Sequence, residues 1–265
     1  MITDEREQDD GILTFIDSCR THIEGRVTEQ WQGAANMVFA TDLGVVWRFP
    51  LRPLDAERID TIADRHRVAH TKGLGAPRVV SVAGGPVGVA HLVLERLAGT
   101  PLLTAVARNQ PTEPAVACAL SRLRSTRAWP FEQISWPTLW ADLVTRADAN
   151  RSHLPDAERH IAAANVAATT AAEAPLGILH GDLGSDNLLI DDSGGFVGLL
   201  DWDGAVIGDP ALDTVAVLHS LPAAESGRLR AEHEWIAADV ARAEVYLATW
   251  ELQDLLGRLL SDRSV

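Results

Sequence analysis

The sequence HGDLGSDN at residues 180–187, followed by LLDWD at residues 199–203, decides the fold predicted for this chain. These stretches place a carboxylate at Asp182, an amide at Asn187 and a second carboxylate at Asp201. Phosphoryl transfer needs a carboxylate that orients the acceptor hydroxyl and takes its proton. It also needs oxygen ligands for Mg²⁺. We therefore predict that Asp182 is the catalytic base and that Asn187 and Asp201 bind the metal.

The spacing of the two stretches has a structural reason. Residues 187–190 and 196–202 have the composition of strands, and the DDSGG sequence between them is typical of a turn. Two strands of similar length return the chain to its starting point, so Asp201 is expected to lie beside Asn187. Isolated Asp and Asn residues are common in ordinary turns, but the combined pattern favours one site.

Both stretches resemble the catalytic loop and the metal loop of the aminoglycoside phosphotransferase and choline kinase group, relatives of the protein kinases. The GDPALD sequence at residues 208–213 is similar to a G-D-P-x-x-D sequence common in that group, and the order of elements resembles it from residue 30 to residue 215. The resemblance implies an α+β, two-lobed protein-kinase-like fold, with a β-rich N-lobe and a mainly helical C-lobe. The GDLG and DWD sequences resemble the viomycin and capreomycin phosphotransferases in particular.

The resemblance also assigns roles to single residues. It implies that Asp182 is the catalytic base, that Asn187 and Asp201 bind Mg²⁺, and that His180 braces the catalytic loop. Asp203 either lies on the metal side or belongs to a solvated turn. Downstream, we expect Asp209 to cap a helix that begins at Pro210, and Asp213 to be structural, anchoring the catalytic loop.

A change of composition near residues 99–101 predicts two domains. We expect residues 1–98 to form a β-rich nucleotide-binding lobe with an opening helix, and residues 99–265 to form a helical lobe with the catalytic loop, the metal loop and the substrate site. The strands expected in the first domain are residues 37–40, 45–49, 78–83 and 87–97, and its helices are residues 11–25 and 54–70. The helices expected in the second domain are residues 114–126, 138–149, 157–172 and 223–260.

The first domain is expected to bind ATP or GTP. By resemblance, residues 31–36, which contain Gly33, take the place of the phosphate-covering loop. Arg48 stands where a protein kinase has its phosphate-pairing lysine, and Lys72, the one lysine of the chain, lies at a helix end. An arginine fork is planar and bidentate, so direct phosphate contact and a structural role both stay open for Arg48.

Two further assignments follow from the same resemblance. The acidic partner of Arg48 is expected on the following helix, at Asp64 or alternatively at Asp60. The segment with Glu95 and Leu97 is similar to the hinge between kinase lobes, where their backbone groups would contact the base. Backbone contacts of this kind do not distinguish ATP from GTP. The sequence has no G-x-x-x-x-G-K-[ST] stretch, which excludes a P-loop NTPase.

Composition restricts the partners and the compartment. The 265 residues carry a formal net charge of −14, which argues against a nucleic-acid-binding surface and is compatible with a cationic small molecule. No apolar stretch approaches the roughly 20 residues of a membrane span. The acidic N-terminus is not typical of a signal peptide, and the two distant cysteines are expected to be reduced. We predict a cytoplasmic enzyme without nucleic-acid or membrane partners.

The acceptor is expected to be a cationic antibiotic, either an aminoglycoside or a basic cyclic peptide, whose phosphorylation confers resistance. Acidic side chains on the C-terminal helices favour a cation, and a solvated helix face explains them too. Four tryptophans either stack on substrate rings or belong to the core. A metabolite kinase acting on an amino alcohol or sugar is the alternative enzyme, and a catalytically inactive nucleotide-binding protein is the alternative class. The residues concerned are Trp136, Trp140, Trp235 and Trp250, and Glu225, Glu232, Glu234, Asp239, Glu244, Glu251 and Asp254.

Overall fold

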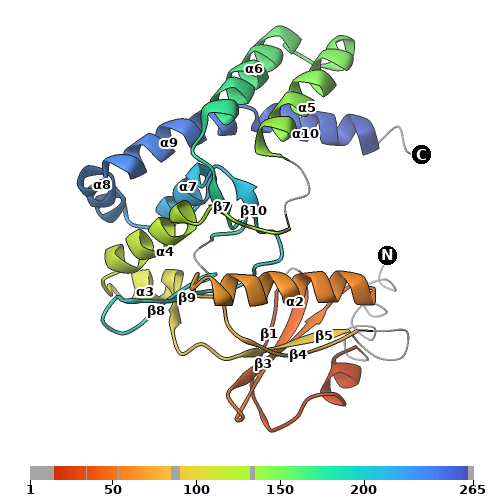
Figure 1. Cartoon of the computed structure of the whole chain (residues 1–265), viewed down its shortest axis with the longest axis vertical. Helices are drawn as coiled ribbons and strands as arrows, with labels where there is room; N and C mark the ends of the chain where they lie inside the picture. Colours follow the sequence, from red (N-terminus) through yellow and green to blue (C-terminus); the bar gives the residue numbers. More distant parts are fainter. Residues whose placement is uncertain are drawn as a thin grey trace, which may run out of the picture. The chain divides into compact units, whose positions relative to one another are not determined.

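The chain folds into two compact units, Met1–Ala98 and Gly99–Val265, each described here by itself. A computed structural model describes residues 15–33, 35–52, 54–84, 90–131, 135–184 and 186–261. The first unit contains a β-sheet with one long helix, and the second is mainly helical (Figure 1). The predicted mixed α+β class is thus confirmed.

The first unit is built on a five-stranded antiparallel sheet with strand order β1-β2-β3-β5-β4. The predicted hairpin is confirmed as β2 and β3. The sequence pattern does not predict β1, because all but its first residue are exposed and no apolar alternation marks it. The predicted strand at residues 87–97 is shorter, and residues 85–89 lie outside the described part of the chain. The strands are β1 (Val27–Gln32), β2 (Asn36–Thr41), β3 (Val45–Pro50), β4 (Val79–Ala83) and β5 (His91–Glu95).

The two faces of this sheet bury different clusters. Val93 of β5 packs with the aromatic side chains of β2 and β3, whereas Leu92 and Leu94 pack with the apolar face of α2 (Ala56–Thr71). Successive side chains of a strand point to opposite faces, which explains this alternation. Arg48 lies opposite Leu92 in the register of β3 and β5 and therefore belongs to the face that α2 covers.

The helices of the first unit agree with the sequence pattern where they are described. Helix α2 confirms the helix expected at residues 54–70, and the Asp55 side chain caps it by accepting a hydrogen bond from the Arg58 N–H at 2.7 Å. Residues 15–20 are helical and form part of the opening helix expected at residues 11–25. Residues 11–14 lie outside the described part.

The second unit contains two small sheets and most of the helices. One sheet has the order β6-β8-β9, and the other pairs β7 with β10. Its strands are β6 (Thr100–Pro101), β7 (Gly177–Leu179), β8 (Leu188–Ile190), β9 (Phe196–Leu199) and β10 (Val206–Gly208). Its helices are α3 (Leu102–Ala107), α4 (Glu113–Ser125), α5 (Trp136–Ala149), α6 (Ala157–Glu173), α7 (Ala211–His219), α8 (Ala223–Glu232), α9 (Glu234–Leu247) and α10 (Trp250–Ser261), with a short 3₁₀ turn at Arg151–His153.

Most of the predicted helices are confirmed within a few residues, with one difference at the C-terminus. Residues 223–260 form three helices, because His233 has extended backbone angles (φ −126°, ψ 95°) and separates α8 from α9, and because α9 ends before Trp250 starts α10. The short helix α3 is not predicted by the sequence pattern. The predicted β-hairpin of the metal loop is confirmed as β8 and β9, whose turn is held by the Asp191 carboxylate.

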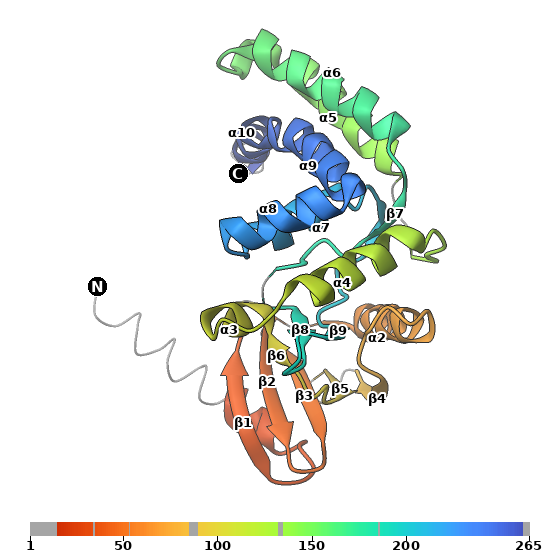
Figure 2. The ribbon, with the colours of Figure 1, turned by 90° about the vertical axis from the view of Figure 1, so that its left-hand side faces the viewer.

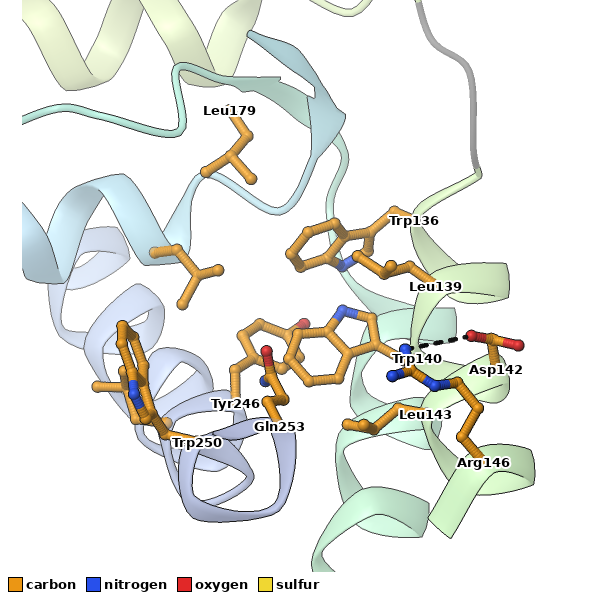
Figure 3. Close-up of a pocket in the computed structure, with 12 residues that line it drawn as sticks. Trp136, Leu139, Trp140, Asp142, Leu143, Arg146, Leu179, Tyr246, Trp250 and Gln253 are labelled. Atoms are coloured by element: carbon orange, nitrogen blue, oxygen red, sulfur yellow. Dashed lines mark ion pairs between the residues drawn. The ribbon is translucent and has the colours of Figure 1, made fainter. Parts of the chain in front are cut away.

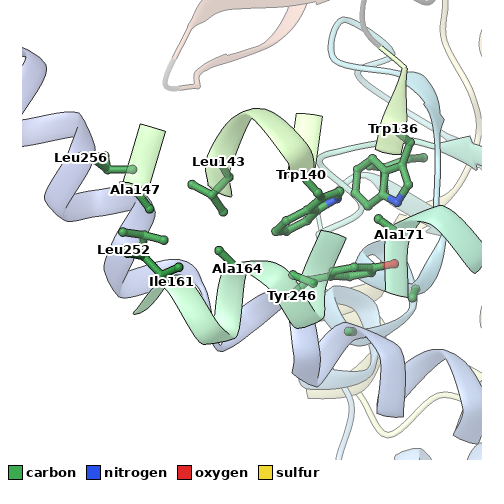
Figure 4. Packing of buried hydrophobic residues seen from close by; sticks show 14 of the residues in the cluster. Trp136, Trp140, Leu143, Ala147, Ile161, Ala164, Ala171, Tyr246, Leu252 and Leu256 are labelled. Atoms are coloured by element: carbon green, nitrogen blue, oxygen red, sulfur yellow. The ribbon is translucent and has the colours of Figure 1, made fainter. Parts of the chain in front are cut away.

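The core of the second unit lies between α5 and α6, which run side by side, and the C-terminal helices (Figures 2 and 4). Trp140 stacks on Tyr246 with ring centroids 4.7 Å apart, and Trp136 meets both rings edge-on. Small residues of α6, such as Ala164 and Ala171, allow the helices to approach closely. Within the described residues, no helix combines the length and the apolar character needed to cross a bilayer.

Candidate active site

The catalytic loop begins where β7 ends, and one buried carboxylate anchors it. Asp213 on α7 is 2% exposed and accepts hydrogen bonds from the backbone N–H groups of His180 and Gly181, the second at 3.1 Å. Burial raises the pKa of Asp213 to about 7, although these N–H donors act in the opposite direction. Gly181 has a φ of +83°, which a glycine adopts without strain. These contacts agree with the anchoring role expected for Asp213.

His180 joins the catalytic loop to the metal loop. Its side chain is fully buried, and Nε2 lies 2.9 Å from the carbonyl oxygen of Leu200. Because a carbonyl oxygen only accepts hydrogen bonds, Nε2 must carry a proton. The imidazole also meets the Trp202 ring edge-to-face, with centroids 4.8 Å apart. These contacts are those of a brace that holds the two loops at a fixed separation.

Asp182 and Asn187 are brought together within the catalytic loop. The Asn187 amide nitrogen donates to Asp182 Oδ2 at 3.0 Å and to the Asp182 carbonyl oxygen at 2.8 Å. The Asp182 side chain is exposed, so an acceptor can reach it from solvent. The amide nitrogen therefore orients the predicted base, while the amide oxygen is the Asn187 atom suited to a metal ion.

The β8–β9 hairpin brings the backbone of Asp201 close to that of Asn187. The Leu200 N–H donates to the Asn187 carbonyl oxygen at 2.8 Å, so Asp201 follows directly on the residue bonded to Asn187. Asp201 has a φ of +57°, a conformation that residues other than glycine rarely adopt. Such backbone persists only where the surrounding structure imposes it, and it often marks functional sites.

The chemistry of this donor set suits Mg²⁺. Magnesium takes oxygen ligands, keeps several waters and is usually bound by one or two carboxylates together with substrate phosphates. The Asp201 carboxylate and the Asn187 amide oxygen match that description. Among the described residues, no three His, Cys, Asp or Glu side chains gather where they could hold a metal alone. A magnesium ion held by these two residues would keep positions for nucleotide phosphates and water.

A buried ionic network fixes α7 behind the catalytic loop. Asp209 is fully buried and accepts hydrogen bonds from Arg242 Nε at 2.7 Å and from the Tyr246 hydroxyl at 3.0 Å. The bond to Asp209 raises the pKa of Arg242, which stays charged. Asp209 also accepts the N–H of Ala211, the first residue of α7, at 3.0 Å. The helix begins one residue later than predicted, so Pro210 and not Asp209 occupies the cap position. Asp239, also fully buried, pairs with Arg242 as well.

In the first unit, Arg48 is tied to the end of β2. The Asn36 amide, oriented with its oxygen toward the guanidinium, accepts hydrogen bonds from Arg48 Nη2 at 2.7 Å and from Nε at 3.0 Å. The Asn36 carbonyl oxygen accepts from the Gly33 N–H at 2.9 Å. Asn36 therefore links Arg48 to the turn between β1 and β2, of which Ala34 lies outside the described residues.

The sequence pattern overlooks Asn36, although one signal for it exists. In the register of β2 and β3, Arg48 lies opposite Val38, and Asn36 is two residues further along the same face. Diagonal neighbours of this kind are within reach of a long side chain. The hairpin itself thus indicates which side chain meets Arg48.

The other residues predicted to contact the nucleotide lie on α2 and around the end of β5. Asp64 is exposed and pairs with Arg67 at 2.7 Å, one turn along α2, and Asp60 is also exposed. The Glu95 N–H donates to the Arg78 carbonyl oxygen within the sheet, and Leu97 is half-buried just beyond β5. The nucleotide contacts assigned to these residues stay predictions.

Comparison with known proteins connects this geometry to one family. A sequence profile described as the phosphotransferase enzyme family matches residues 27–249. None of the curated protein sequences compared with the chain matches it. The predicted resemblance to aminoglycoside phosphotransferases and choline kinases is confirmed by solved structures of both kinds, and it extends to the kinase-like fold.

Three of these structures illustrate the likeness. The GDP complex of wild-type aminoglycoside 2'-phosphotransferase-IIIa has a TM-score of 0.65 and 16% identity, over 94% of this chain and 92% of that chain. Aminoglycoside phosphotransferase APH(3'')-Id from Streptomyces rimosus, in complex with ADP and streptomycin, has a TM-score of 0.59 and 22% identity, over 92% and 98%. A choline/ethanolamine kinase family protein from Mesorhizobium loti has a TM-score of 0.63 and 20% identity, over 100% and 89%.

Proposed function

We propose a reaction centre for this chain, which belongs to the phosphotransferase enzyme family and is a phosphotransferase that acts on hydroxyl groups of small molecules. In this centre Asp182 is the catalytic base, and Asn187 and Asp201 bind Mg²⁺. The observation that carries the proposal is the hydrogen bond from the Asn187 amide to Asp182 Oδ2, because it joins the base to a metal ligand. The phosphoryl donor in this proposal is ATP or GTP.

The transfer step needs little covalent help from the protein. The acceptor oxygen attacks the γ-phosphorus, its proton passes to the Asp182 carboxylate, and the bond from the γ-phosphorus to the bridging oxygen breaks to release the nucleoside diphosphate. Asn187 holds the carboxylate in place for that proton, and His180 keeps the loop fixed against Leu200. Bound Mg²⁺ supplies charge neutralisation at the phosphates.

The nucleotide is proposed to bind the first unit, with Arg48 near the phosphates, Gly33 in the covering turn, and backbone groups of Glu95 and Leu97 at the base. Support comes from the structural neighbours, of which one binds GDP and another binds ADP. Both cysteines are free thiols, which fits our proposal of a cytoplasmic enzyme with access to these nucleotides.

For the acceptor, we propose an antibiotic, so that phosphorylation confers resistance. The support is the group of neighbours named as aminoglycoside phosphotransferases. The second candidate is an amino-alcohol metabolite, because a choline/ethanolamine kinase family protein matches the whole chain at a similar TM-score.

The proposal is tested by nucleotide consumption with Mg²⁺ and either ATP or GTP, using kanamycin, streptomycin, choline and ethanolamine as acceptors. We expect Asp182→Asn to keep nucleotide affinity and to lose turnover by about 10²–10⁴-fold, the typical contribution of a general base. The matched control is Asp192→Asn in the exposed β8–β9 turn, which should keep wild-type turnover. Undiminished turnover in Asp182→Asn would remove the base from the mechanism.

A further inference from the structure

The second unit contains a pocket of about 450 Å³ that the site above does not use (Figure 3). Trp136 and Trp140 of α5, Tyr246 of α9 and Trp250 of α10 contribute rings to its lining. The pocket lies within the size range of small-molecule sites. It is therefore large enough for a drug-sized molecule or for the main body of one.

The lining offers flat apolar surface and little charge. The charged side chains among its lining residues are Asp142 and Arg146, which pair with each other at 3.9 Å on one side of the pocket (Figure 3). The Gln253 amide is a neutral polar group beside Tyr246, and the indole N–H groups of Trp136 and Trp140 belong to the same lining. A lining of this kind favours rings and aliphatic groups, because it has no surplus negative charge to replace the hydration of a polycation.

Trp250 adds exposed apolar surface to the pocket. Figure 3 shows Trp250 on one side of the pocket, with Trp140 and Tyr246 across from it. Trp250 is 68% exposed, and Leu139 at the α5 side is 46% exposed. Both are large apolar side chains that line the pocket and remain in water. A bound apolar group would cover them, which is the usual meaning of apolar surface exposed around a concavity.

The pocket is built on the same elements that hold the catalytic loop. Leu179, which lines it, is the last residue of β7 and directly precedes His180. Leu212, also part of the lining, directly precedes Asp213, whose carboxylate binds the loop backbone. The strand and the helix that line the pocket therefore also carry the groups that position Asp182.

Three of the seven carboxylates expected to hold a cationic acceptor form ion pairs within the chain. Asp239 is buried and pairs with Arg124 and Arg242. Glu251 pairs with Arg159, which lowers the pKa of Glu251 and keeps it charged against that arginine. On the same helix, Asp254 pairs with Arg258. These arginines neutralise part of the negative charge that a polycation would need.

We infer that this aromatic pocket receives the acceptor, and that the acceptor is a hydroxyl-bearing molecule with an apolar, ring-containing body rather than a polycationic sugar. The inference rests on the proposed function, because it supplies the substrate class for the same reaction. The rings of Trp140, Tyr246 and Trp250 hold the body, and the hydroxyl extends toward Asp182.

The test uses 2-naphthaleneethanol and estradiol as ring-containing probes and kanamycin as the polycationic one. Calorimetry measures their binding to the full chain, to Trp250→Ala and to Val166→Ala, an exposed apolar control on α6 outside the pocket. We expect both ring-containing probes to bind more tightly than kanamycin. Trp250→Ala should weaken their binding about tenfold, the effect of losing one aromatic contact, and Val166→Ala should leave it within about twofold. Unchanged melting temperatures confirm that both variants fold.

The outcomes separate the inference from the proposed function. The inference is overturned if the ring-containing probes do not bind, or if Trp250→Ala leaves their affinity unchanged. The inference is also overturned if kanamycin supports Asp182-dependent consumption of nucleotide at a KM that Trp250→Ala does not raise. That result leaves the proposed function intact. If the ring-containing probes bind in a way that depends on Trp250, but nucleotide is not consumed with any acceptor, the ligand class is supported and the proposed function is refuted.

Discussion

Two regions of the molecule are stabilised by different kinds of hydrogen bond. The catalytic segment of the second unit comprises the catalytic loop, the metal loop and Asp213, and the Arg48 segment of the first unit comprises Arg48, Asn36 and Asp64. In the catalytic segment, most of the contacts run from side chains to main-chain atoms: Asp213 accepts backbone N–H groups, and His180 contacts a backbone carbonyl. The bond from the Asn187 amide to the Asp182 carboxylate is the exception. Around Arg48, side chains bind side chains, with Arg48 joined to the Asn36 amide and Asp64 joined to Arg67.

This difference teaches which part of an active site a sequence motif prescribes. The bonds of the catalytic segment join residues 20 to 33 positions apart. Each partner nevertheless lies within or beside one of three short motifs, at residues 180–187, 199–203 and 208–213, so these motifs convey the contacts. A bond between two side chains depends on strand register and on the rotamers of both partners. The two segments can therefore be tested separately, because mutations in the first should affect turnover and the dependence on Mg²⁺, whereas mutations in the second should affect the nucleotide KM.

The largest effect is expected at the metal loop. Asp201→Ala removes the one carboxylate among the two proposed metal ligands, so Mg²⁺-dependent nucleotide binding should be lost and turnover should fall by roughly 10³-fold or more, the scale on which electrostatic stabilisation of the transition state acts. Calorimetric titration of nucleotide with and without Mg²⁺ measures the first effect. A steady-state assay measures the second.

Asp191→Ala provides the matched control for this variant. Asp191 is an exposed carboxylate in the same hairpin, and it caps the turn through the N–H groups of Ser193 and Gly195. Its loss should lower stability slightly without changing the Mg²⁺ dependence. Equal Mg²⁺ titrations for Asp201→Ala and the wild type would show that the metal binds elsewhere.

The sequence predicts much of the catalytic segment, because its residues lie in short motifs. The hairpin after Asn187 and the anchoring by Asp213 both follow from turn and motif patterns. The pairing of Arg48 with Asn36 is overlooked, because it depends on the register of the β2–β3 hairpin and not on a motif. The pocket is equally hidden, since Trp140 and Trp250 come from helices that are far apart in the sequence and meet only through tertiary packing.

The next effect concerns stability and its pH dependence at Asp213. The pKa of this carboxyl is raised from 3.8 to about 7 in the folded chain by burial, so the folded state binds a proton that the unfolded state releases between these values. The group therefore stabilises the fold most below pH 4, and this contribution falls as the pH rises toward 7. Asp213→Asn replaces the carboxyl group with an amide, which is uncharged at every pH. The wild type should lose stability relative to the variant by on the order of a few kcal/mol across this range.

Urea unfolding of both proteins between pH 4.5 and pH 8 measures this difference, with stabilities compared at each pH. The same series should show slower turnover for Asp213→Asn, because the amide introduced by this substitution no longer accepts the backbone N–H groups of His180 and Gly181 with two oxygens. If the stability of the wild type relative to the variant rises with pH, or does not change with it, Asp213 must be ionised throughout.

The smallest effects are expected around Arg48, where they identify its functional partner. Asn36→Ala removes the acceptor of two bonds from a guanidinium that is 8% exposed, so stability should fall by about 1–3 kcal/mol and the nucleotide KM should rise with it. Asp64→Ala removes only an exposed pair with Arg67, which contributes less than about 0.5 kcal/mol. If Asp64→Ala nevertheless raises the nucleotide KM as much as Asn36→Ala does, Arg48 must change partners from Asn36 to Asp64 when the nucleotide binds.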